Sequence, residues 1–361
     1  MYKQRGLRLK LIAAATCLLA GGAAHAQSSV TLYGLVDGGL LYTSKTLNTT
    51  TGQNAGHQFS MIDSGNSPSQ FGVMGTEDLG GGLKAEFKLE SGISMSNGGL
   101  NDSNGNLFGR QAYVGLDSNY GDVKVGLQFS PFFLSVYELD PRDLSQFGSG
   151  LLPYLDSVIA TGIFNANSIS YTSPKVYGFQ GSVMLGLGGV AGDFQAGRNY
   201  SANLSYSTGT FLINAGFYDS NAGGAATPVP STYAFEGRVI GMSYKFGKLT
   251  AKASFTSYKG TGLAGSFNDN VYSGGLDWLV TPRVDLNGGV WYTSDRSDTT
   301  NHSVMGAIGT DYYLSRATTL YAQFGVVNNH GTMDTGLSVD SALNGAAGTT
   351  VGADIGIRHI F

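Results

Sequence analysis

Hydrophobic and polar positions alternate with a period of two residues along most of the chain. The clearest segment is 83–90, in which four apolar residues alternate with four charged ones: Leu83, Ala85, Phe87 and Leu89 against Lys84, Glu86, Lys88 and Glu90. Because successive side chains of a strand point to opposite faces, this segment predicts a strand with one wet face and one apolar face. A shift of one residue would bury all four charges, so the pattern also fixes the register of the strand.

The stretch from Thr349 to Phe361 alternates in the same way, with Asp354 and Arg358 on the polar parity and Phe361 on the apolar one. Such a strand needs a partner, because an open edge exposes unpaired N–H and C=O groups. In a membrane the only solution for strands is a closed barrel. We therefore expect Thr349–Phe361 to pair with the alternating stretch Val30–Tyr42 and to close a barrel.

Counting these segments, the pattern predicts sixteen strands over the whole chain. The remaining ones are 69–77, 108–116, 123–129, 167–173, 179–189, 199–207, 211–220, 233–246, 249–258, 270–280, 284–294, 302–314 and 318–327. Short connections such as Phe246–Lys248 and Thr281–Arg283 alternate with long polar ones such as 45–67 and 328–348. Long loops at one end and tight turns at the other are typical of an up-and-down transmembrane barrel.

The composition agrees with an all-β membrane protein that has no further domain. The chain has 20 tyrosines, 19 phenylalanines and 55 glycines, and only 13% of its residues are charged. Strands with a lipid-facing side and aromatic girdles have this character, and a large secreted β-sandwich or β-helix would share it. No stretch approaches 18 consecutive apolar residues, so the sequence predicts no transmembrane helix.

Residues 1–26 have the pattern of a signal peptide, and residues 27–361 are then the barrel. Four basic residues precede a short apolar run that ends at Ala24-His25-Ala26, a small-x-small cleavage site. Removing this segment takes away four of the 21 basic residues and none of the 25 acidic ones, which leaves a formal net charge of −8. A nucleic-acid partner would need a basic face, so we expect none. The single cysteine, Cys17, lies inside this segment.

One long connection, residues 131–166, breaks the strand pattern and carries large apolar side chains throughout. Loops of this length are usually functional, and a barrel offers an inner wall on which the loop can pack. We expect it to fold into the lumen and to form a constriction; a lid packed on the rim is the alternative. Its charged residues would then meet the passing solutes: Glu138, Asp140, Arg142, Asp143 and Asp156.

With these features in place, the chain resembles the general diffusion porins of Gram-negative outer membranes, most closely the trimeric type of beta-proteobacteria. The resemblance rests on short motifs that run in family order: 30–34 with Asp37, 71–80, 108–116, 167–174, 311–315 with 319–321, and 356–361.

The resemblance implies a homotrimer of 16-stranded barrels in outer-membrane lipid, each with an inward third loop. It implies passive diffusion of small hydrophilic solutes and ions, and recognition of Phe361 by the barrel-assembly machinery. We expect these residues to line the lumen: Asp37, Gln70, Lys84, Glu86, Lys88 and Arg110.

Three departures from the family pattern bear on ion selectivity. Gln70 stands where members usually carry an arginine in a Ser-Arg-Phe-Gly motif, Leu127 stands in place of the arginine of Gly-Arg-Gln, and Phe164 stands near a further arginine position. Of the basic residues that members of the family usually carry along the lumen wall, Arg110 is retained. The lumen wall then has fewer basic residues than is usual in the family, and the long connection adds acidic ones. We therefore expect a weak selectivity for cations, because salt screens distant charges and leaves those near the constriction effective.

The alternative functions are a substrate-specific channel, an outer-membrane enzyme and a plugged adhesive barrel. The histidines His57, His302, His330 and His359 show no short metal spacing, and with no cysteine after residue 26 we expect neither a metal site nor a cofactor. No serine and histidine stand in a recognisable catalytic context, so we expect no catalytic residue and no enzyme. Asn101–Asn106 resembles part of a calcium loop but lacks the closing glutamate, which favours a solvated external loop.

Overall fold

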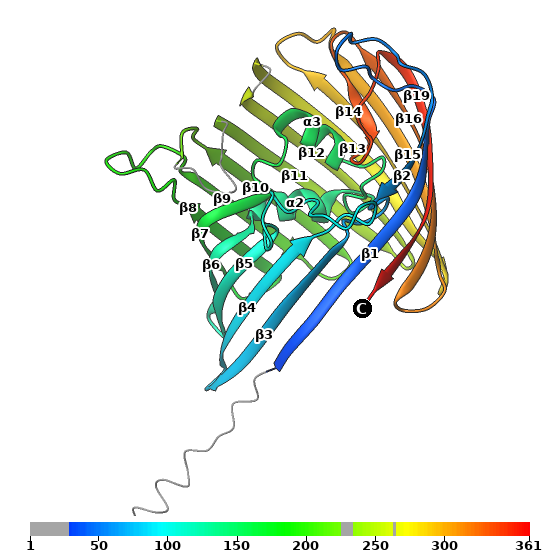
Figure 1. The fold of residues 1–361 in the computed structure, drawn as a ribbon. Helices are drawn as coiled ribbons and strands as arrows, with labels where there is room; N and C mark the ends of the chain where they lie inside the picture. Colours follow the sequence, from blue (N-terminus) through cyan, green and yellow to red (C-terminus); the bar gives the residue numbers. More distant parts are fainter. Residues whose placement is uncertain (1–28, 225–233, 263–264) are drawn as a thin grey trace, which may run out of the picture.

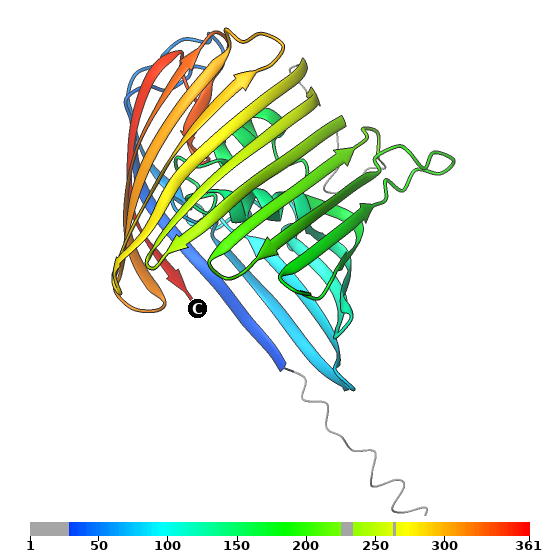
Figure 2. The same ribbon diagram turned by 180° about the vertical axis from the view of Figure 1, so that it is seen from behind.

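The computed structural model describes residues 29–224, 234–262 and 265–361. Within this part of the chain, sixteen antiparallel strand positions form a closed barrel (Figure 1, Figure 2), which confirms the predicted fold class. The strands are β1 (Ser29–Thr43), β2 (Gln58–Asp63), β3 (Gln70–Gly80), β4 (Leu83–Gly92), β5 (Gln111–Ser118), β6 (Gly121–Phe129), β7 (Phe164–Thr172), β8 (Phe179–Gly186), β9 (Asn199–Ser207), β10 (Phe211–Ser220), β11 (Ala234–Phe246), β12 (Leu249–Gly262), β13 (Gly265–Thr281), β14 (Val284–Asp295), β15 (His302–Tyr313), β16 (Thr318–His330) and β19 (Gly348–Ile360). The predicted leader, residues 1–26, lies outside the described residues.

Two of these strands share one position in the wall. β1 pairs with β3 along 29–35 and with β2 along 38–43, so β2 and β3 are two halves of one interrupted strand. The sequence prediction of a loop over 45–67 was wrong here. Phe59 and Met61 are exposed on the outer side of β2, and this alternation is too short to stand out between polar loops.

The alternation sorts the side chains between lipid and lumen along each strand. On β15, Ser303 and Met305 are each 1% exposed, whereas Val304 and Ile308 are 41% and 63% exposed on the outside. The outer face is therefore apolar, as a surface in contact with acyl chains must be. The inner face is covered by polar side chains and by the long connection.

β19 closes the barrel against β1, as the sequence predicted. Asp37 lies opposite Arg358, and Leu41 lies opposite Asp354. The backbones of Gly34 and Phe361 exchange two hydrogen bonds, each of 3.0 Å. The aromatic ring of Phe361 covers Gly34, where a Cβ atom would lie 2.3 Å from Cζ of that ring. Glycine is needed at position 34 because the ring approaches the backbone so closely.

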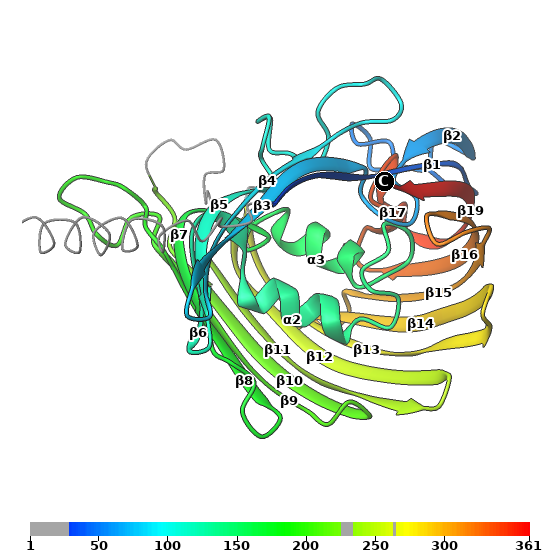
Figure 3. The ribbon, with the colours of Figure 1, turned by 90° about the horizontal axis from the view of Figure 1, so that it is seen from below.

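The long connection carries two helices, α2 (Pro131–Leu139) and α3 (Leu151–Val158), which lie inside the ring of strands (Figure 3). Ser130 caps α2 by accepting a hydrogen bond from the amide of Phe133, and Pro131 occupies the first turn, where its missing N–H group is harmless. The inward position agrees with the sequence prediction. None of the helices in the described ranges is long and apolar enough to cross a membrane.

Several strand boundaries differ from the sequence prediction by up to five residues, and two differences matter for the site. The strand predicted over 108–116 begins at Gln111, because residues 109 and 110 belong to an inward turn held by side-chain hydrogen bonds. The polar connection 328–348 contains a small hairpin, β17 (Thr335–Ser338) and β18 (Ala342–Asn344), which packs against α3. Its strands are too short for a periodic signal.

The closure suggests a test at Phe361. Deleting this residue removes two backbone hydrogen bonds and one ring contact from the seam, so we expect a loss of about 2 kcal/mol of folding stability and a lower yield of folded barrel. Heat-induced unfolding on a semi-native gel measures both. The matched control, Phe361→Tyr, keeps the bonds and the ring and is expected to fold normally. Barrels that do form should conduct normally, because Phe361 lies on the outer face; a deletion variant as stable as the wild type would contradict this role.

Candidate functional site

The candidate site is the constriction that α2, α3 and the segment between them form inside the barrel. α2 packs on β9–β12 through its buried side chains Phe132, Val136 and Leu139. The ring of Phe132 lies 6.1 Å from that of Phe235 and 6.3 Å from that of Tyr218. This aromatic cluster holds the helix against one side of the lumen, because burial of large rings is strongly favourable.

Arg142 fastens the segment between the two helices to the barrel wall. Its guanidinium donates to Oδ1 of Asn287 on β14 at 2.8 Å, to the carbonyl oxygens of Phe147 and Gly148 at 2.6 and 2.8 Å, and to Oε1 of Gln323 on β16. Arg142 is 6% exposed. Burial lowers the pKa of its guanidinium to about 10, so it stays charged at neutral pH. The sequence indicated a charge in this loop but could not show that it is turned into the wall.

Asp140 is likewise an internal fastening of the loop. Its carboxylate accepts hydrogen bonds from the amides of Arg142 (2.9 Å), Leu144 (3.1 Å) and Gly150 (2.8 Å) and from Nε1 of Trp291 (3.0 Å). Burial raises its pKa above the ordinary value despite these donors. With 3% exposure, it does not face the water of the channel.

The other two acids at this end of the loop are exposed and paired. Glu138 accepts a hydrogen bond of 2.7 Å from Nδ2 of Asn214. Asp143 forms an ion pair of 2.5 Å with Nζ of Lys252 on β12. Lys252 also donates to the carbonyl oxygen of Asp140 at 2.9 Å, so it ties the loop to the wall.

Asp156 on α3 faces the β17–β18 hairpin instead of the constriction. It accepts hydrogen bonds from Oγ1 of Thr335 (3.1 Å) and from Nδ2 of Asn344 (3.3 Å), and Asn344 also donates to Asp334 (3.3 Å). Burial and, secondarily, the neighbouring Asp334 carboxylate raise the pKa of Asp156 to about 8. Asp156 therefore stabilises the contact between α3 and the β17–β18 hairpin chiefly while its carboxyl group is protonated.

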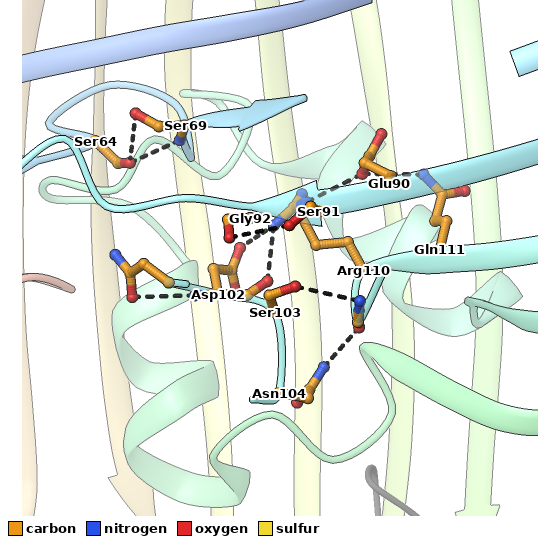
Figure 4. A network of polar contacts seen from close by, with 12 residues as sticks. Ser64, Ser69, Glu90, Ser91, Gly92, Asp102, Ser103, Asn104, Arg110 and Gln111 are labelled. Atoms are coloured by element: carbon orange, nitrogen blue, oxygen red, sulfur yellow. Dashed lines mark hydrogen bonds and ion pairs between the residues drawn. The ribbon is translucent and has the colours of Figure 1, made fainter. Parts of the chain in front are cut away.

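The wall across the lumen from α2 carries a dense polar network (Figure 4). Glu90 is its centre and accepts from Nε of Arg110 (3.0 Å), Nζ of Lys88 (3.0 Å), the hydroxyl of Tyr33 (2.8 Å) and Nε2 of Gln111 (3.3 Å). This arrangement satisfies a carboxylate that is only 1% exposed.

Arg110 is held on three sides. Beyond Glu90 it forms an ion pair with Asp102, which folds back from the connection between β4 and β5 (Figure 4). Its guanidinium also lies 5.9 Å and 5.7 Å from the ring centres of Phe129 and Phe164. The Asn101–Asn106 stretch therefore supplies an acidic partner to the inner wall, a role its sequence does not reveal.

The remaining residues expected on the lumen wall differ in place. Gln70 lines the cavity beside Lys88, whereas Asp37 is buried and anchors residues 66 and 67 through their amides at 3.0 and 2.8 Å. Glu86 pairs with Lys124 at 3.4 Å, on the same face but farther down. Lys84 is exposed beside the β3–β4 turn, roughly 20 Å along the strand from Glu90.

A second polar cavity lies beside the loop and shows acids that the sequence analysis did not single out. Asp277, Asp285 and Asp311 on β13, β14 and β15 line it together with Asp143 and Arg358. All three lie on predicted strands, at alternating positions that face the lumen. This alternation is the sequence signal from which they could have been predicted. They converge because β13, β14 and β15 are consecutive paired strands, in which Asp285 lies directly opposite Asp311. Within the described residues, no group of three or more acidic, histidine or cysteine side chains has a geometry that could hold a metal ion.

The Asp156 contact gives a pH prediction. In a detached loop this carboxyl has an ordinary pKa near 4, so the contact is fully stable below about pH 4 and weakens as pH rises through about 8. We expect amide exchange of residues 335–344 to accelerate between pH 6 and 8, by at most roughly tenfold per pH unit beyond the intrinsic chemical rate. Asp156→Asn should remove this extra dependence. If the amide exchange of residues 335–344 depended on pH in Asp156→Asn as it does in the wild type, another group would control the contact.

Comparison with known proteins agrees with this geometry. A model of the Gram-negative porin family matches residues 12–332. Outer membrane porin protein 32 of Delftia acidovorans is 30% identical, and the match covers 98% of this chain and 99% of that protein. An outer membrane porin protein of Bordetella pertussis is 29% identical over 98% of this chain and 100% of its own length.

Among solved structures, the anion-selective porin from Comamonas acidovorans superimposes with a TM-score of 0.79 and 25% identity, covering 93% of this chain and 100% of that one. The fold, the inward loop and these matches lead to one conclusion. This chain belongs to the Gram-negative porin family and forms an outer-membrane β-barrel channel for passive diffusion.

Proposed function

We propose that this porin is a general diffusion channel with weak selectivity for cations. The observation that carries the proposal is the acidic cavity beside the constriction, which Asp143, Asp277, Asp285 and Asp311 line together with the partly exposed Arg358. Of the other cations nearby, Lys252 is already paired with Asp143, and Arg142 is buried. Carboxylates that line a narrow passage favour cations, because screening by salt leaves only nearby charges effective.

The basic residues on the opposite wall weigh little against these acids. Lys88 and Arg110 are both paired with Glu90, and Arg110 is also paired with Asp102. The positions Gln70, Leu127 and Phe164 carry no charge. The structural relative from Comamonas acidovorans is described as anion-selective; the proposal for this chain departs from that property because its own cations are neutralised.

The lining and constriction residues divide into two roles in this proposal. Glu138 and Asp143, with Gln70, Lys88 and Glu86, contact passing water and ions. Asp37, Asp140, Arg142 and Asp156 hold the loop and the wall in place, and Arg110 orders the network around Glu90. Lys84 acts only at the far end of the channel.

The assembly that we propose rests on the family resemblance. Residues 1–26 direct export, the barrel of 27–361 inserts after the assembly machinery reads Phe361, and three copies associate in outer-membrane lipid. The exposed apolar side chains Met95, Leu100 and Leu107 on the β4–β5 connection support a contact with a neighbouring subunit. The chain acts as a channel and performs no chemical step.

The selectivity proposal is tested by the zero-current potential of single channels in a gradient of KCl. We expect its sign to show a potassium-to-chloride permeability ratio above 1. Asp277→Asn together with Asp285→Asn should move the ratio toward 1, since two lining charges are removed. The matched control, Asp193→Asn with Asp298→Asn, removes two acids from outer loops and should leave it unchanged. A clear preference for chloride in the wild type would refute the proposal.

A further inference from the structure

α2 exposes two large hydrophobic side chains beside Glu138, although its opposite face is already packed. Phe132, Val136 and Leu139 are buried against the wall, whereas Leu134 and Tyr137 are each 48% exposed. A helix in contact with water normally presents a polar outer face. Apolar side chains that are exposed together inside a channel often mark a contact site.

The apolar face continues beyond α2 around one side of a single cavity. Phe133 extends it along the helix, and Leu151 and Leu155 extend it from α3. The cavity has a volume of about 390 Å³. That volume is in the range of small-molecule sites and leaves room for one aromatic ring with a polar substituent. Phe129 and Phe164 also border it, but Arg110 already lies over their rings.

The opposite side of this cavity is polar but carries no net charge. Lys88 and Arg110 supply two positive charges, and Glu90 and Asp102 supply two negative ones, all within one connected set of ion pairs. The other acid that lines the cavity, Asp143, is balanced by its ion pair with Lys252. Gln70 and Gln111 add neutral hydrogen-bonding groups. A passing molecule therefore meets an apolar surface on one side and ion-paired and neutral polar side chains on the other.

The geometry points to a weak binding site in the constriction for aromatic solutes that carry no net charge and have a polar edge. The aromatic face lies on Leu134 and Tyr137, and the polar edge hydrogen-bonds toward Gln70 and Lys88. A simple sugar of similar size gains only the polar contacts. A charged solute loses hydration at the apolar side and finds no unpaired counter-ion. This inference rests on the proposed diffusion function and names a solute class that the channel retains longer than others.

The experiment compares two glucosides in single-channel recordings in planar bilayers. Phenyl β-glucoside and methyl β-glucoside, at equal concentration, differ in the aromatic ring. We expect the phenyl compound to interrupt the current roughly tenfold longer than the methyl compound. In Leu134→Ser with Tyr137→Ser, the two should become equal within about twofold, because the apolar contact is lost. Benzoate and benzylammonium should both give shorter interruptions than phenyl β-glucoside.

The matched control is Ile159→Ser, which removes an exposed apolar side chain from the same connection outside this cavity. It should keep the wild-type difference between the glucosides. Equal interruptions in the wild type, or a difference that survives in the double variant, would overturn the inference. Longer interruptions by benzoate or benzylammonium would overturn its requirement for no net charge. A protein that does not conduct would refute the channel itself, which separates the two outcomes.

Discussion

The hydrogen-bonded seam between β1 and β19 is the contact on which the rest of the structure depends. Nine residues of β1, from Leu35 to Thr43, lie in register with β19. Without that seam two strand edges would stand in the membrane, where nothing satisfies their backbone groups. Closure also decides which parity of every strand meets lipid and which meets water. The charged face of 84–90 and the acids Asp277, Asp285 and Asp311 point into the lumen for this one reason.

The constriction follows from that closed wall. Residues 131–163 carry large apolar side chains together with backbone groups that need partners, and the inner wall supplies both kinds of contact. The aromatic cluster around Phe132 holds α2, and the buried charges Asp140 and Arg142 bind the loop to itself and to β14 and β16. Buried charges are tolerated here because every one of them has several hydrogen-bond partners. The buried charges of the loop thus serve to position it, whereas its exposed surface carries Leu134 and Tyr137 beside Glu138 and Asp143.

The sequence predicted the barrel because period-two alternation is local and repeated in nearly every strand. It also predicted the inward loop, because an apolar connection of this length needs a wall. It missed β2, where Phe59 and Met61 give too few alternations. It could not separate Asp140, which caps a turn, from Asp143, which faces water, because the two lie three residues apart and differ only in the path of the backbone. The partnership of Arg110 with Asp102 was out of reach for the same reason: it depends on how the β4–β5 connection folds back.

The central claim is that the segment carrying α2 lies in the channel with Leu134 facing the passage. The most direct test is the single-channel conductance of Leu134→Cys, in a chain that lacks Cys17, before and after reaction with a charged methanethiosulfonate reagent. The account predicts a stepwise fall in conductance as the bulky charged group enters the constriction. An unchanged conductance, with mass spectrometry showing complete modification of residue 134, would contradict it.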